Sequence, residues 1–135
     1  MTAAWIAEEL VPVEDRDAAP GAPIRLAASR CSACGRCSFP VTGACTWCGA
    51  TGSDPVPLSR GAAVVATAVL HRTPGAVVEV PFVVALARFG QAGLDVLGRV
   101  PDATDPAAVP AGTPLRVVAE SLPDGRLHYA FAVAQ

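Results

Sequence analysis

Two closely spaced cysteine pairs constrain this sequence more than any other feature. Each pair has the pattern C-x2-C followed by glycine, at Gly35 and at Gly49, and ten residues separate the pairs. The paired residues are Cys31, Cys34, Cys45 and Cys48. Two tight turns of this kind deliver four thiolates to one tetrahedral metal ion, and glycine suits a turn that requires a positive φ. The spacing therefore predicts a chain that folds around a metal-binding ribbon.

Zinc is the expected metal, with one structural Zn²⁺ per chain. Zn²⁺ favours four soft ligands at about 2.3 Å in tetrahedral geometry. Because the four thiolates fill that geometry, no position remains for a catalytic water. The turns are also expected to point backbone N–H groups at the sulfurs and so to spread the thiolate charge. Iron also binds at four thiolates, and nothing in the spacing selects it.

Disulfide bonds and thiol redox chemistry are the alternative uses of these cysteines. The first ten residues carry two Glu and no basic residue, unlike a secretory signal, and five cysteines are an odd number. Both observations weigh against disulfides. A redox pair is expected at a helix start beside a βαβ pattern, which this sequence lacks. Cys37, the fifth cysteine, has no glycine after it and is expected not to be a ligand.

The remainder of the chain has the pattern of short β-strands. Runs rich in Val and aromatic residues alternate with turns rich in Gly and Pro. They predict strands at residues 62–71, 77–89, 93–100, 115–121 and 126–134, with one helical turn within 101–111. Five strands with an insertion between the third and the fourth outline an OB-fold. The predicted fold class is all-β, with an N-terminal rubredoxin-like zinc ribbon before a five-stranded OB-fold barrel. A five-stranded barrel of another topology is the alternative.

The predicted organisation has three parts. Residues 1–23 form an N-terminal arm interrupted by prolines, either a loose tail or a segment that docks through Trp5 and Leu10. Residues 24–60 hold the ribbon and its connector. A short strand is expected over 24–30, and the Asp-Pro-Val-Pro segment at 54–57 is expected to be a stiff connector. Residues 61–135 form the barrel.

The charge distribution argues against a nucleic-acid-binding protein, the alternative function that an OB-fold suggests. Lys is absent, and each half of the chain carries five Arg against six acidic residues. Single-strand binders instead concentrate positive charge along a groove with exposed aromatic residues. Phe82, Phe89 and Phe131 lie within apolar runs, where core packing is expected. A stand-alone nucleic-acid module is thus the second hypothesis.

No catalytic motif is recognisable in the sequence. It contains neither a Gly-rich phosphate loop nor a Gly-x-Ser-x-Gly turn, and His71 and His128 each lie alone in a predicted strand. The longest apolar stretch, residues 62–70, is about half of a membrane span. A non-enzymatic cytoplasmic protein without a membrane segment is expected.

The chain resembles the DUF35 family of zinc-ribbon and OB-fold proteins over about residues 24–135. The motifs that carry the resemblance are Arg-Cys-x2-Cys-Gly at 30–35, Phe39-Pro40, Cys45-x2-Cys48-Gly49, Leu58 before Gly61, Pro-Phe-Val-Val-Ala-Leu at 81–86 and Pro-Ala-Gly-Thr at 110–113. The usual longer N-terminal helical region is reduced to the arm, and Val41 replaces the second Pro often found after Phe-Pro.

The resemblance implies an accessory role. DUF35 proteins are similar in forming complexes with thiolase-like enzymes that act on acyl-CoA or related acyl thioesters, in which the partner holds the catalytic Cys and His residues. The DUF35 subunit docks on that partner and helps to enclose the acyl-CoA. This chain is accordingly expected to be a non-catalytic subunit, one copy per partner subunit.

The surfaces expected to serve this role are the loop at 72–76 and the arm around Trp5. Arg72, Arg88 and Arg99 are candidates for contacting the phosphates of CoA, because Arg binds phosphate in a bidentate manner.

Overall fold

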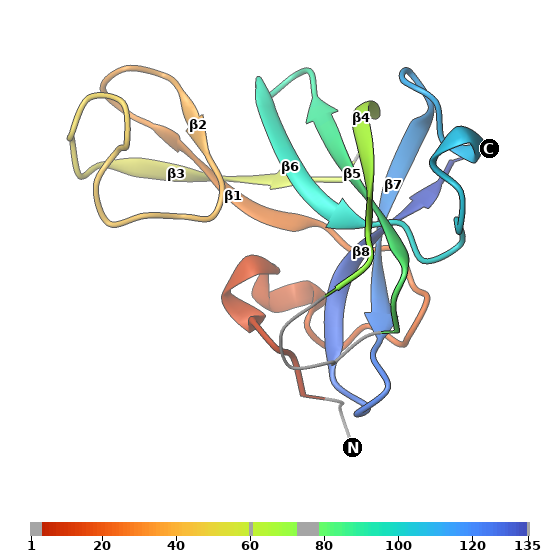
Figure 1. The fold of residues 1–135 in the computed structure, drawn as a ribbon. Helices are drawn as coiled ribbons and strands as arrows, with labels where there is room; N and C mark the ends of the chain where they lie inside the picture. The colour runs from red at the N-terminus through yellow and green to blue at the C-terminus, as the bar shows by residue number, and fades with distance from the viewer. Residues whose placement is uncertain (1–3, 60, 73–78, 135) are drawn as a thin grey trace.

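The computed structural model describes residues 4–59, 61–72 and 79–134 and is built almost wholly from β-strands (Figure 1). Short 3₁₀ turns are the other regular elements: η1 (Glu8–Leu10), η2 (Val13–Asp15) and η3 (Pro106–Ala108). The strands form two sheets, one of three strands in the ribbon and one of five in the barrel. The predicted all-β fold is confirmed. Within the described ranges, no helix is long and apolar enough to cross a membrane.

The ribbon sheet has the order β2-β1-β3 and projects to one side of the barrel in Figure 1. Its strands are β1 (Leu26–Cys31), β2 (Cys37–Ser38) and β3 (Ser53–Leu58), and both pairings with β1 are antiparallel. The prediction of a stiff connector at 54–57 was wrong, since these residues lie in β3. Proline is tolerated on an edge strand, where its missing N–H faces away from the ladder. Pro55 and Pro57 are two residues apart and therefore share one orientation.

The barrel sheet has the order β6-β5-β4-β7-β8, with every neighbouring pair antiparallel. Its strands are β4 (Ala62–Leu70), β5 (Phe82–Phe89), β6 (Leu94–Arg99), β7 (Pro114–Ser121) and β8 (Leu127–Val133). The first three strands form a meander, the fourth returns to pair with the first, and β6 approaches β8 to bring the sheet close to closure. This Greek-key order is that of an OB-fold.

The predicted strand limits differ most at β5. The prediction began at residue 77; residues 77–78 lie outside the described residues, and β5 itself begins at Phe82. Pro81 precedes it, and its missing N–H cannot take part in a central ladder. The helical turn expected within 101–111 is present as η3, where the Asp105 carboxylate accepts a hydrogen bond from the Ala107 N–H.

The core lies inside the barrel and continues under the ribbon and the arm. Its largest fully buried side chains include Phe89, Phe131, Leu26, Leu127 and Val11. The phenylalanine rings lie 6.4 Å apart and are tilted, a favourable arrangement for aromatic pairs. Leu26 comes from the ribbon and Val11 from the arm, so one continuous core joins the three parts.

The N-terminal arm packs on the barrel. Trp5 forms a bridge with Leu127 of β8, and its indole N–H donates to the Arg16 carbonyl at 2.8 Å. Further along, the Gly21 N–H donates to the Ala119 carbonyl at 2.7 Å. Of the two states considered for the arm, the structure has the docked one. The residue limits of the three predicted domains remain a prediction.

Candidate metal centre

The two cysteine turns have the same local backbone structure. The Gly35 N–H donates to the Cys31 carbonyl, and the Gly49 N–H donates to the Cys45 carbonyl, each at 2.9 Å. The two glycines have φ values of 78° and 80°, a left-handed conformation that costs glycine little. The repeated C-x2-C-Gly sequence therefore folds twice into one turn, and each turn presents two thiols on the same side.

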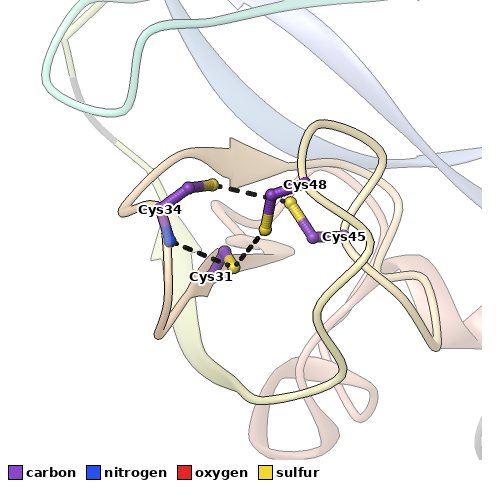
Figure 2. Close-up of side chains that lie close together, drawn as sticks. All are labelled: Cys31, Cys34, Cys45 and Cys48. Atoms are coloured by element: carbon purple, nitrogen blue, oxygen red, sulfur yellow. Dashed lines mark hydrogen bonds between the residues drawn. The ribbon is translucent and has the colours of Figure 1, made fainter.

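The four thiols of the paired cysteines converge between the turns, as Figure 2 shows. Their sulfur atoms all lie within 4.8 Å of one another. The Cys31 and Cys48 sulfurs are 3.5 Å apart, and those of Cys34 and Cys45 are 3.7 Å apart. Four sulfurs held about 2.3 Å from a central tetrahedral ion lie roughly 3.8 Å from one another. The cluster therefore fits one tetrahedral metal ion, held by both turns.

Backbone N–H groups favour the thiolate form in both turns. The N–H groups of Cys34 and Ala33 point at the Cys31 sulfur and lower the pKa of that thiol to about 6. Those of Cys48 and Trp47 lower the pKa of Cys45 in the same way. Thiolates are the form that binds metal, so each turn favours the metal-binding form of its first thiol. The pKa of Cys48 is instead raised to about 11: the Ala50 N–H lowers it, but the Cys31 thiol and burial outweigh that bond.

Cys37 lies apart from this cluster. It is buried in β2, where it pairs with Arg30 of β1, and it is not one of the four clustered thiols. All five cysteines are free thiols in the structure.

The three arginines expected at CoA phosphates lie on different strands or loops. Arg88 and Asp95 form an ion pair at 2.8 Å across β5 and β6. Arg99 forms an ion pair with Glu120, and both side chains are largely buried. Arg72 is exposed after β4 and forms no ion pair with a described residue. The rest of the loop, residues 73–76, lies outside the described residues.

The two histidines have separate surroundings. His71 is exposed after β4. His128 is half-buried in β8, with its ring centroid 4.6 Å from that of Tyr129. Burial of the imidazole lowers its pKa, and the positive charge of Arg99 lowers it further.

Fold and thiol cluster together define the class: a four-thiol ribbon joined to an OB-fold barrel. Among solved structures, a chain of the "Ltp2-ChsH2(DUF35) aldolase" is similar, with 26% sequence identity and a TM-score of 0.65. The match covers 82% of this chain and 86% of that chain. Comparisons with protein-family models and with curated proteins found no match. The likeness confirms the resemblance to DUF35 proteins, and the neighbour's description joins a DUF35 protein to an aldolase.

Proposed function

We propose that this chain is the accessory subunit of a thiolase-like enzyme that acts on acyl-CoA or related acyl thioesters. The observation that carries the proposal is the likeness to a DUF35 chain of an aldolase over most of both chains. In this proposal the partner supplies the catalytic residues, and the present chain docks on it and helps to enclose the substrate.

The proposed metal is Zn²⁺, held by Cys31, Cys34, Cys45 and Cys48. Four thiolates in a tetrahedral arrangement are a common structural zinc site, and a site closed by four protein ligands has no open position for water. Zinc would therefore stabilise the ribbon and not take part in the partner's chemistry. This agrees with a subunit that is required for assembly and is itself non-catalytic.

The proposed contact surface begins at Arg72, the one of the three candidate arginines that forms no ion pair with a described residue. A guanidinium with no carboxylate partner among the described residues can pair with phosphate or with an acidic side chain of the partner. Arg88 and Arg99 already have carboxylate partners, so their binding to CoA phosphates would require exchange of an ion pair.

Co-expression with the thiolase-like protein encoded nearest to this chain tests the proposal. We expect the two to co-elute in size exclusion, one copy of this chain per partner subunit, and the complex to turn over an acyl-CoA substrate faster than the partner alone. Arg72→Ala should weaken co-elution, while Arg126→Ala, which removes an equal charge from the β7–β8 turn, should leave it intact.

Two results would contradict the proposal. The first is a thiolase-like partner that is soluble and fully active alone and never co-elutes with this chain. The second is salt-sensitive binding of this chain to single-stranded DNA or RNA far tighter than the about 10⁻⁴–10⁻⁶ M of non-specific binders, which would favour the nucleic-acid module instead.

A further inference from the structure

A second site lies between the cysteine turns and the barrel. It is a cavity of about 490 Å³ bounded by Arg30 of β1, Arg36 and Trp47 of the cysteine turns, and the turn 90–93 that joins β5 to β6. That volume is in the range of small-molecule sites in proteins. The metal cluster does not use these side chains, because its ligands are the four sulfurs.

Two guanidinium groups at the cavity, those of Arg30 and Arg36, form no ion pair with a described residue, and Asp54 lies opposite Arg30 in the register of β1 and β3. Among the described residues, the ion pairs involve Arg25, Arg88, Arg99 and Arg126, and none involves Arg30 or Arg36. Both side chains are exposed at the cavity. Because the chain as a whole carries a net charge of −2, this is a local concentration of positive charge and not part of a general basic surface.

An aromatic ring stands beside these charges. The Arg36 guanidinium lies over the Trp47 ring, 4.6 Å from its centroid, and Trp47 is still 61% exposed. A large apolar ring with this much surface in water is a candidate for covering by another flat group. The pair combines a cation and a stacking surface, and proteins that bind single-stranded nucleic acids use the same combination for phosphates and bases.

The packing of the two cysteine turns brings Arg36 and Trp47 together. Arg36 directly follows Gly35 of the first turn, and Trp47 lies between the cysteines of the second. The four thiols of the two turns converge, as Figure 2 shows. Because the turns face each other, Arg36 of one lies against Trp47 of the other. Gln91 of the turn 90–93 also lines the cavity.

We propose that this cavity binds a nucleoside phosphate, with the phosphate on Arg30 and Arg36 and the base stacked on Trp47. Charge-assisted hydrogen bonds from guanidinium to phosphate give the strength, and the ring gives the preference for an aromatic base. The choice of an adenosine 3′,5′-bisphosphate as probe rests on the proposed function, because coenzyme A ends in a phosphorylated adenosine.

The test is a titration of the full-length, zinc-loaded chain with adenosine 3′,5′-bisphosphate. Tryptophan fluorescence is measured at each addition. We expect saturable quenching with a Kd below about 1 mM and loss of the signal in Trp47→Phe. Arg30→Ala and Arg36→Ala should each weaken binding about tenfold or more. Arg126→Ala should bind as the unchanged chain does. Because Arg36→Ala removes a contact within the ribbon, Arg36→Lys, which keeps the charge, is compared with it at equal zinc content.

Several results would overturn the site: no saturable response up to about 1 mM, an equal loss of affinity in Arg126→Ala, or equally tight binding of adenosine alone or inorganic phosphate alone. A single-stranded oligonucleotide that binds here far more tightly than the bisphosphate would do the same. Co-elution with the thiolase-like partner is measured separately. A chain that binds the nucleotide but never co-elutes keeps this site and loses the accessory role, and the reverse result keeps the role and removes the site.

Discussion

Gly35 and Gly49 occupy equivalent positions in the two cysteine turns. With positive φ, each glycine closes its turn through an N–H bond to the carbonyl of the first cysteine in the pair. The same turn directs N–H groups at the sulfur of that first cysteine, which lowers the pKa of Cys31 and of Cys45. The turn geometry and the readiness of the first thiol in each pair to ionise are thus set by the same few residues.

The metal content of the purified chain tests the assignment of the four cysteine ligands. Elemental analysis of the purified chain should give about one zinc, because structural zinc at four thiolates binds with about 10–16 kcal/mol in small domains. Cys45→Ser removes one ligand and should release the metal and unfold the ribbon, as judged by circular dichroism. Cys37→Ser is the matched control and should keep the metal. A disulfide in the mass spectrum, or metal loss only on changing Cys37, would refute the assignment.

The barrel is not fully closed between β6 and β8, which are not hydrogen-bonded neighbours in the sheet. These strands are the two ends of the five-stranded order. The Tyr129 hydroxyl of β8 donates to the Leu97 carbonyl of β6, and the Arg99–Glu120 ion pair ties β6 to the neighbouring strand β7. Gly98 in β6 lets the aromatic rings of β8 approach the backbone. The absence of a side chain at Gly98 therefore permits the barrel to close.

Gly98→Ala tests this element. A Cβ there would lie 2.6 Å from Phe131 Cε2 and 3.0 Å from Tyr129 Cε2, too close for carbon atoms, and Phe131 is fully buried. Overpacking of this kind costs about 1–3 kcal/mol in free energy of unfolding, measurable by urea titration. Gly90→Ala in the adjoining turn is the control, since a Cβ there meets no atom within 4 Å. Equal free energies of unfolding for the two variants would contradict the role given to Gly98 in the approach of β6 to β8.

The arm links the ribbon and the barrel in the whole molecule. Its Asp15 carboxylate accepts three hydrogen bonds from Arg25, which directly precedes β1: one from the backbone N–H at 2.8 Å and two from the guanidinium at 3.0 and 2.9 Å. On the other side, Trp5 reaches β8, and Val11 is 1% exposed within the core. The arm thus contacts both neighbouring parts, which explains how a segment rich in proline stays in place.

The pH dependence of stability tests this attachment. The hydrogen bonds from the Arg25 side chain lower the pKa of Asp15 below its ordinary value of 3.8, so its stabilising contribution is complete above that value and is lost as pH falls through the lowered pKa. Near neutral pH, Asp15→Asn should reduce the free energy of unfolding by about 1–2 kcal/mol, because Arg25 is partly exposed and solvent screens the pair. The difference from the unchanged chain should shrink in acid.

Glu14→Gln is the control for that measurement. Glu14 is exposed and lies 3.8 Å from the same guanidinium, so its loss should change stability by less than about 0.5 kcal/mol. Equal effects of the two substitutions, or a difference that grows in acid, would contradict the role given to Asp15.

The amino-acid sequence by itself determined the features that depend on neighbouring residues. C-x2-C-Gly specifies its own turn, and alternating Val-rich runs specify strands, so the clustered thiols and the all-β class follow from short stretches of chain. The tertiary structure decided the features that depend on distant contacts. The 54–57 segment became β3 only because β1 offered it an edge. The arm docked because it could contact Leu127 of the barrel and Arg25, the residue before β1. Arg36 and Trp47 meet because the two turns face each other. Such contacts form only when the free energy gained by packing exceeds the free-energy cost of the entropy lost in closing long loops. A pattern of neighbouring residues does not contain the information about distant contacts that this comparison needs.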